Sequence, residues 1–216
     1  MKIMKRGKEA KILVGIDEVG RGSLAGPVTV AAVAIPEKLN LTRSDLVRLR
    51  DSKKLSPKQR EQWFQYIRSH NRIFYALASV SSAGVDKLNV SQAANLAASR
   101  AFFKLMTSQV VHLKKKRLKI FLDAGLSLPA DIPSRTFIKG DERFNCVKLA
   151  SIIAKVSRDR LMAGKFHKKF PQYGFVHHKG YGTKEHFLAI KKHGSSPIHR
   201  LTFIKKYNNI NLKRKA

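Results

Sequence analysis

The stretch Gly15-Ile16-Asp17-Glu18-Val19-Gly20-Arg21-Gly22 joins an apolar run that begins at Ile12 to two adjacent carboxylates and a glycine-rich turn. This order predicts a buried strand that delivers acidic groups to an exposed loop. Glycines permit a backbone that another molecule can approach closely, and Arg21 between them offers a donor suited to phosphate. A strand that simply ends in a charged turn, without a functional site, is the simpler interpretation. The rest of the chain has to decide between a functional and a purely structural role.

The composition limits which classes of protein this chain can belong to. The chain has 216 residues, 43% of them hydrophobic, which is enough for one sizeable core with a small appendage. Lys and Arg number 44 against 14 Asp and Glu, so the formal net charge is +30 and a polyanion is the expected partner. The absence of a membrane-length apolar run or a signal peptide predicts a cytoplasmic location. The single cysteine, Cys146, excludes an internal disulfide and lies in an apolar helical pattern typical of packing.

Five apolar segments predict strands, and the second of them is apolar on both faces, which predicts a sheet covered on both sides. The strands are expected at residues 11–17, 27–36, 72–81, 120–122 and 135–138. The basic cluster from His112 to Lys119 is interpreted as a solvated loop.

Helices are predicted between these strands. Ser56 and Pro57 supply an N-cap and a first residue for a helix that ends near His70 and buries Trp63. Ser91 is expected to cap a second helix that ends near residue 107, and Asp141 a long third helix from about 144 to 162. Beyond Gly164 the composition shifts to Lys, His, Gly and aromatic residues. We therefore predict a main domain at 1–163 and a small helical or loop-rich extension at 164–216 packed on it.

Four acidic residues stand out in this acid-poor chain: Asp17, Glu18, Asp123 and Asp159. Asp123 repeats the first pattern, because it follows a short strand and precedes a glycine-containing turn. Asp159 shares one helix face with Ser151 and Lys155, which are spaced four apart. An ordinary ion pair between Lys155 and Asp159 is an equally good interpretation of that spacing.

Carboxylates on neighbouring strand ends would repel a polyanion unless divalent cations lay between them. Oxygen ligands without cysteine or a compact histidine motif suit Mg²⁺ or Mn²⁺. Two such ions about 4 Å apart can activate a water and stabilise charge on a phosphate, which predicts phosphodiester hydrolysis. Five histidines cluster in the C-terminal part without zinc-site spacing, so phosphate contact or core hydrogen bonding is expected of them: His177, His178, His186, His193 and His199.

Several ordered blocks together closely resemble bacterial ribonuclease HII. They span residues 15 to 203 and comprise Gly15-Ile16-Asp17-Glu18-x-Gly20-Arg21-Gly22 with Gly26-Pro27, Asp51-Ser52-Lys53-x-Leu55, Lys139-Gly140-Asp141, Ala150-Ser151-Ile152-x-Ala154-Lys155-Val156-x-Arg158-Asp159, Tyr173-Gly174-Phe175, Lys179-Gly180-Tyr181-Gly182-Thr183 and His199-Arg200. The resemblance implies an α/β ribonuclease H-like fold, with a central mixed five-stranded sheet flanked by helices. It also implies cleavage of the RNA strand of RNA/DNA hybrids and nicking of duplex DNA 5′ of embedded ribonucleotides. The products would carry 3′-hydroxyl and 5′-phosphate ends, as ribonucleotide excision repair and primer removal require.

The resemblance also assigns roles to residues. By position, Asp17, Glu18, Asp123 and Asp159 match the four metal-binding catalytic carboxylates of the family. Gly20, Arg21 and Gly22 match the motif that contacts the ribose 2′-hydroxyl, a group displayed in the minor groove. Tyr181 matches the tyrosine that stacks on the following sugar. The remaining candidate contacts to the substrate are Lys53, Ser151, Lys179 and Lys184. The three lysines and Arg21 are expected to contact phosphates.

The chain departs from the family pattern at two positions, and two alternative functions stay open. The family usually has glycine directly after the third acid, where this chain has Ala124, and a smaller alanine where it has Val19. A displaced turn would leave the metal geometry at Asp123 in question. A non-catalytic nucleic-acid-binding protein would explain the charge, and ribonuclease HIII shares the fold but typically carries an extra N-terminal domain. No membrane association and no obligate protein partner are expected, and a monomer is predicted.

Overall fold

The computed structural model describes residues 11–108 and 117–205, and its centre is a five-stranded mixed sheet in the order β3-β2-β1-β4-β5. β1 pairs antiparallel with β2, which pairs antiparallel with β3, while β1, β4 and β5 run parallel. This arrangement confirms the predicted α/β fold. The strands are β1 (Lys11–Val19), β2 (Val28–Pro36), β3 (Phe74–Val80), β4 (Arg117–Asp123) and β5 (Arg135–Phe137).

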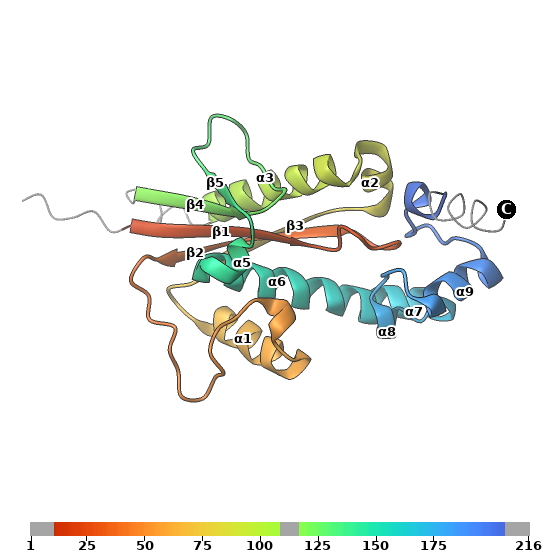
Figure 1. The fold of residues 1–216 in the computed structure, drawn as a ribbon, viewed down its shortest axis with the longest axis horizontal. Coiled ribbons are helices and arrows are strands. Elements are labelled where there is room, and N and C mark those ends of the chain that lie inside the picture. The colour runs from red at the N-terminus through yellow and green to blue at the C-terminus, as the bar shows by residue number, and fades with distance from the viewer. Residues whose placement is uncertain (1–10, 109–116, 206–216) are drawn as a thin grey trace, which may run out of the picture.

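Helices cover both faces of the sheet, as the doubly apolar second strand predicted (Figure 1). The face below the sheet in this view is covered by α1 (Pro57–Ser69) and α6 (Asn145–Leu161), and the face above it by α2 (Ser82–Leu88) and α3 (Val90–Ser108). The remaining short elements are η1 (Ser52–Lys54), α5 (Gly140–Arg143), η2 (Met162–Phe166), α7 (His167–Lys169), η3 (Pro171–Tyr173), α8 (Phe175–His178) and α9 (Lys184–His193).

The alternation of side chains along β2 divides the interior into two apolar cores. Val30 and Ala32 belong to the core under α3, whereas Ala31 and Val33 belong to the core with α1 and α6. All four are fully buried, as is Trp63 of α1. Burying both faces explains why this strand is a continuous apolar run.

Close contact between α6 and β1 depends on Gly15. A Cβ atom at Gly15 would lie only 2.2 Å from the backbone carbon of Cys146 and 2.3 Å from the backbone nitrogen of Val147. The start of α6 therefore lies directly on the strand. Asp17, two residues further along the strand, points to the same face.

Several predicted boundaries were wrong. Arg117 to Lys119 begin β4 instead of ending a basic loop, because they pair with β1; residues 112–116 lie outside the described residues. The first turn of α3 is capped by Asn89 and not by Ser91, since the Asn89 side chain accepts hydrogen bonds from the backbone N–H groups of Ser91 and Gln92.

The region before α6 also differs from the prediction. Asp141 does not cap a long helix, because the short helix α5 ends at an extended Phe144 before α6 begins. The serine-rich segment after β3 contains the unpredicted helix α2, which Ser81 caps by accepting a hydrogen bond from the N–H of Gly84.

The helical path continues from α6 through η2 into α7, and the shorter helices that follow lie at the same end of the molecule (Figure 1). A small core connects these helices to the loop after β1 and contains Ala25, Met162, Tyr173 and Phe175. The division at residues 163 and 164 stays a prediction. None of the helices among the described residues has the length and apolarity needed to cross a bilayer.

Candidate active site

Two parallel strands deliver the first and third predicted acids to the same edge of the sheet. β1 and β4 are paired up to Ile16 and Leu122, and Asp17 and Asp123 are the next residues in each strand. Parallel neighbours place their carboxyl ends together. Ligand oxygens of Asp17, Glu18 and Asp123 all lie within 4.8 Å of one another. Residues distant in sequence thus form one carboxylate group, here called the acidic trio.

Asp17 is nearly fully buried and is held in place by its neighbours. Its Oδ1 accepts a hydrogen bond of 2.8 Å from the backbone N–H of Glu18. The hydroxyl of Ser151 on α6 also forms a hydrogen bond with the Asp17 carboxylate, and the Oγ atoms of Ser151 and Ser52 are 2.8 Å apart. The two hydroxyls thus form a buried pair next to the Asp17 carboxylate, in which either can be the donor. Ser151 therefore lies beneath the acids, and its predicted contact with substrate stays a prediction.

Crowding and burial make it unfavourable to ionise Asp17 and Glu18. Burial, followed by repulsion from Glu18, raises the pKa of Asp17 well above its ordinary value. Burial likewise raises the pKa of Glu18 from 4.5 to about 7, although Arg21, whose Nη1 is 3.6 Å from Glu18 Oε1, acts in the opposite direction. The buried Oε2 of Glu18 has no hydrogen-bond partner among the described residues.

The alanine after the third acid does not displace it. Asp123 Oδ1 accepts a 2.8 Å hydrogen bond from the backbone N–H of Gly140, at the start of α5. The left-handed conformation of the turn falls on Gly125, with a φ of 83°, and Ala124 is exposed. The turn thus accommodates Ala124 between Asp123 and its glycine, and Asp123 still belongs to the trio.

Asp159 is not a member of the trio. Its Oδ1 accepts a 3.1 Å hydrogen bond from Nζ of Lys155, one turn earlier on α6, which is the ion pair that the spacing allowed. It lines a surface cavity together with Lys155, Lys179 and Tyr181. A role for Asp159 in metal binding stays a prediction.

A second carboxylate pair, which we did not predict, lies beside the trio. Asp51 and Asp141 are both buried and share a side-chain hydrogen bond. Burial, followed by repulsion from Asp51 and Asp123, raises the pKa of Asp141 to about 6. Burial disfavours the charged form of Lys53, but attraction from Asp51, Asp141, Asp17 and Asp123 outweighs it and raises the pKa of that lysine. The only sequence signal for Asp51 and Asp141 is that both lie in the motif blocks that resemble ribonuclease HII.

The glycine-rich turn next to the trio is tightly packed on its inner side. Gly20 has a φ of 88°, and a Cβ atom there would lie 2.3 Å from Nε of Arg158. The Arg21 guanidinium donates to the carbonyl of Gly125 and to the hydroxyl of Ser91, both at 3.1 Å. Gly22 is exposed. Gly22 is therefore the accessible part of the turn, whereas Gly20 is buried and the Arg21 side chain is partly engaged within the protein.

Two fully buried arginines tie this loop to the segment that contains Tyr181. Arg158 donates to the carbonyls of Pro27, Ala25 and Lys179 at 2.9 to 3.0 Å. Arg200 donates to the carbonyls of Gly26 and Arg21 at 2.8 to 3.1 Å. Within the described ranges neither arginine forms an ion pair with a carboxylate. Sequence reasoning missed both roles, because nothing in the pattern marks an arginine as buried.

Two of the other predicted contacts, Lys179 and Tyr181, line the same surface cavity as Asp159. The Tyr181 ring is half-buried between Lys155 and Arg158, whose charged groups lie 5.6 and 5.5 Å from its centroid. Lys179 donates from Nζ to the carbonyl of Val176. Lys184 is exposed at the first position of α9.

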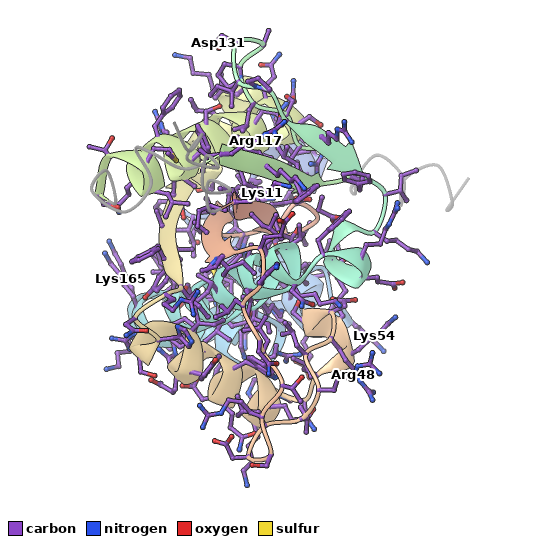
Figure 2. The ribbon with its side chains drawn as sticks, turned by 90° about the vertical axis from the view of Figure 1, so that its left-hand side faces the viewer. Lys11, Arg48, Lys54, Arg117, Asp131 and Lys165 are labelled. Carbon is purple, nitrogen blue, oxygen red and sulfur yellow. The ribbon has the colours of Figure 1, made fainter. Side chains whose placement is uncertain are left out.

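Basic side chains also cover the opposite end of the molecule. Figure 2 shows Lys11 and Arg117, the paired first residues of β1 and β4, near one another. Arg48 and Lys54 instead line a surface pocket together with Asp51. Lys54 pairs with Glu142 at 2.9 Å. The basic side chains are thus spread over the surface instead of being confined to the surroundings of the trio.

Comparison with known proteins decides which enzyme carries this site. The family model for ribonuclease HII matches residues 14–206, which include the trio, the glycine-rich turn and the Tyr181 segment. The chain belongs to the ribonuclease HII family. It is therefore a ribonuclease H, and the matched residues include the acidic trio, whose three carboxylates are close enough together to hold a metal ion.

Individual relatives agree with the family match. A ribonuclease HII of Desulfitobacterium hafniense is 46% identical over 192 residues, covering 88% of this chain and 68% of the relative. One from Endomicrobium trichonymphae is 44% identical over 191 residues, covering 88% and 84%. The crystal structure of ribonuclease H2 from Pyrococcus horikoshii superposes with a TM-score of 0.64 at 28% identity, covering 88% of this chain and 93% of that one.

Proposed function

We propose that this ribonuclease HII hydrolyses the RNA strand of RNA/DNA hybrids and nicks duplex DNA on the 5′ side of embedded ribonucleotides. Its products would carry 3′-hydroxyl and 5′-phosphate ends, which suits ribonucleotide excision repair and primer removal. The observation that carries the proposal is the acidic trio beside a glycine-rich turn that is exposed at Gly22. A site for phosphate chemistry thus adjoins a backbone that can reach a ribose 2′-hydroxyl.

The trio fits a hard divalent cation. All its donors are carboxylate oxygens, one of them is buried without a partner, and Mg²⁺ and Mn²⁺ prefer oxygen ligands. We infer that Asp17, Glu18 and Asp123 hold Mg²⁺ or Mn²⁺, and that Asp159 contributes when it releases Lys155. When bound, a pair of such ions would supply an activated water and stabilise charge on the scissile phosphate.

The remaining residues bind and orient the substrate. In this proposal the backbone of Gly20 to Gly22 contacts the 2′-hydroxyl, and the half-exposed ring of Tyr181 packs on the next sugar. Lys53 faces the four surrounding acids and would lie close to the scissile phosphate once cations neutralise them. Lys179 and Lys184 would contact phosphates further along the duplex.

The raised pKa values of Asp17 and Glu18 support a site built for cations. Without a cation, Asp17 and Glu18 favour their protonated forms because burial and mutual repulsion oppose ionisation. Asp17 and Glu18 would give up these protons when they hold a divalent ion, because metal ligands must be deprotonated. Binding of Mg²⁺ should therefore release protons near neutral pH, which isothermal titration in buffers of different ionisation enthalpy measures.

Cleavage of a labelled DNA duplex with one ribonucleotide tests the proposal. The wild type should nick it on the 5′ side with Mg²⁺ or Mn²⁺ and not with excess chelator. Asp17→Asn should abolish nicking while preserving duplex binding, whereas the exposed control Glu37→Gln should retain it.

The substrates separate the alternatives. Salt-sensitive binding without cleavage would indicate a binding protein. Cleavage of a continuous hybrid but not of the single-ribonucleotide duplex would indicate the specificity of ribonuclease HIII. Full nicking by Asp17→Asn would contradict the assignment of the trio.

A further inference from the structure

Three buried histidines form a contiguous cluster behind Tyr181. His178 ends α8, His186 lies in α9 and His199 follows the chain reversal after α9. The rings of His178 and His186 stack with centroids 4.3 Å apart, and those of His186 and His199 are 5.2 Å apart. None of them is in the acidic trio, and the proposed chemistry leaves them unused.

The hydrogen bonds fix which nitrogen of each ring carries a proton. The backbone N–H of Ser196 donates to Nδ1 of His199 at 2.9 Å, so the His199 proton must be on Nε2. His199 Nε2 lies 3.0 Å from His186 Nε2, which therefore accepts. The proton of His186 is then on Nδ1, from which it donates to the Tyr181 carbonyl at 2.9 Å. These contacts form a chain of hydrogen bonds, here called the imidazole relay, from Ser196 to Tyr181.

His178 completes the support of the same turn. Its Nδ1 accepts a 3.2 Å hydrogen bond from the N–H of Gly180, so its Nε2–H donates to the Tyr173 carbonyl at 2.7 Å. Burial lowers the pKa of all three rings, and it brings those of His186 and His199 to about 4. The rings are therefore neutral at physiological pH, as the relay requires.

The hydrogen-bond pattern excludes a zinc site formed by the three rings. Each ring nitrogen of His178, His186 and His199 already has a protein partner. A metal would need free, unprotonated nitrogens directed at one point. The relay instead ends on a backbone carbonyl.

The turn before Tyr181 needs such support because its backbone is strained. Lys179 and Gly180 both have positive φ values, 52° and 85°. A Cβ atom at Gly180 would lie 2.6 Å from the carbonyl oxygen of Ala25. Conformations of this kind persist only when the surroundings determine them. Arg158 bonds the Lys179 carbonyl, and the imidazole relay bonds the Tyr181 carbonyl.

We propose that His186 and His199 are positioning residues that set the place of Tyr181 against the substrate sugar. The inference rests on the proposed function, because it assigns that role to Tyr181. Neither histidine touches the substrate. They act through the Tyr181 carbonyl, which also accepts a 2.9 Å hydrogen bond from the backbone N–H of Thr183. Losing the relay leaves only that local bond on the carbonyl, so that the ring can shift relative to the acidic trio.

Two substitutions of His186 separate this role from general packing. His186→Asn leaves an amide near the position of Nδ1 and can still donate to Tyr181. His186→Gln places its amide near Nε2, where it reaches His199 but not Tyr181. We expect His186→Gln to lower kcat/KM on the single-ribonucleotide duplex by at least about tenfold, and His186→Asn by no more than about threefold. Equal losses in both, with equal thermal stability, would overturn the proposal.

A double-variant cycle tests whether the effect passes through the tyrosine. In a Tyr181→Ala background, His186→Gln should cause no further loss of kcat/KM. An undiminished further loss would show that His186 acts elsewhere and would overturn the proposal.

The relay is also measurable in the wild type without any activity. Long-range ¹H–¹⁵N NMR at pH 7 should show His186 protonated on Nδ1 and His199 on Nε2. The opposite tautomer of either, or a charged ring, would overturn the proposal. An inactive wild type with these tautomers would refute the proposed function and leave the relay intact, so the two failures are distinguishable.

Discussion

Replacing Glu18 with glutamine measures how much the crowded acidic trio destabilises the metal-free protein. The pKa of Glu18 rises from 4.5 to about 7, chiefly through burial. At about 1.4 kcal/mol for each pH unit, this difference corresponds to about 3 kcal/mol. A raised pKa means that the folded state binds the proton more tightly than the unfolded state. The destabilisation is therefore absent well below pH 4.5 and complete above pH 7.

Glu18→Gln keeps the shape of the side chain and removes its charge. In chelator at pH 8, its free energy of unfolding should exceed that of the wild type by up to about 3 kcal/mol, and at pH 5 by less than about 1 kcal/mol. For a chain of this size the gain at pH 8 corresponds to a rise in Tm of roughly 6 to 12 °C. Nicking should be lost, because the variant gives up a proposed metal ligand.

Calorimetric unfolding across pH 4 to 8 provides the assay, with Glu37→Gln as the matched control. Glu37 is exposed and pairs with Lys119 at 2.8 Å, so removing its charge should bring no gain. Added Mg²⁺ should raise the Tm of the wild type and raise that of Glu18→Gln less. No gain at pH 8, or the same gain at pH 4 as at pH 8, would refute the reasoning.

Three further predictions follow from buried positions. Gly15→Ala should lower the free energy of unfolding by about 3 kcal/mol or more in denaturant titration, because the new Cβ would meet the α6 backbone. The control Gly164→Ala, whose Cβ would enter open space, should leave the free energy of unfolding unchanged. Lowering the pH from 7 to 5 should reduce the free energy of unfolding by about 2 kcal/mol for each of His186 and His199. The reason is that their folded pKa of about 4 lies below the ordinary 6.5, so the unfolded state takes up protons first. In calorimetry with chelator, His199→Gln should therefore lose less stability than the wild type over this pH range. The buried thiol of Cys146, whose pKa rises to about 12, should react with a disulfide reagent only after unfolding, and rapid labelling of the native protein would contradict its burial.

The sequence predicted the sheet well because its strands are strongly apolar and its caps are local. Ser56 and Pro57 begin α1 as expected, since an N-cap depends on residues within one turn. Local reasoning failed where tertiary contacts decide. Arg117 to Lys119 resemble a loop by composition, yet pairing with β1 makes them strand.

The candidate site shows the same limit. The pattern of acids after strands identified Asp17 and Asp123, because strand ends in a parallel pair meet at one edge. For Asp159 the helical spacing could not decide between an ion pair and a ligand, and the structure shows the pair with Lys155. The buried role of Arg200 had no local signal, since arginine is normally exposed and its partners are carbonyls far along the chain.

The neighbouring positions of β1 and β4 also determine when the acidic trio can assemble during synthesis of the chain. In the chain, β2, β3 and the helices α1 to α3 separate these two strands. A ribosome therefore releases Asp17 and Glu18 long before Asp123 leaves the exit tunnel, and the cation pocket cannot close on a partial product. Nascent or prematurely terminated chains that stop before β4 should consequently bind nucleic acid through their basic surface without cutting it.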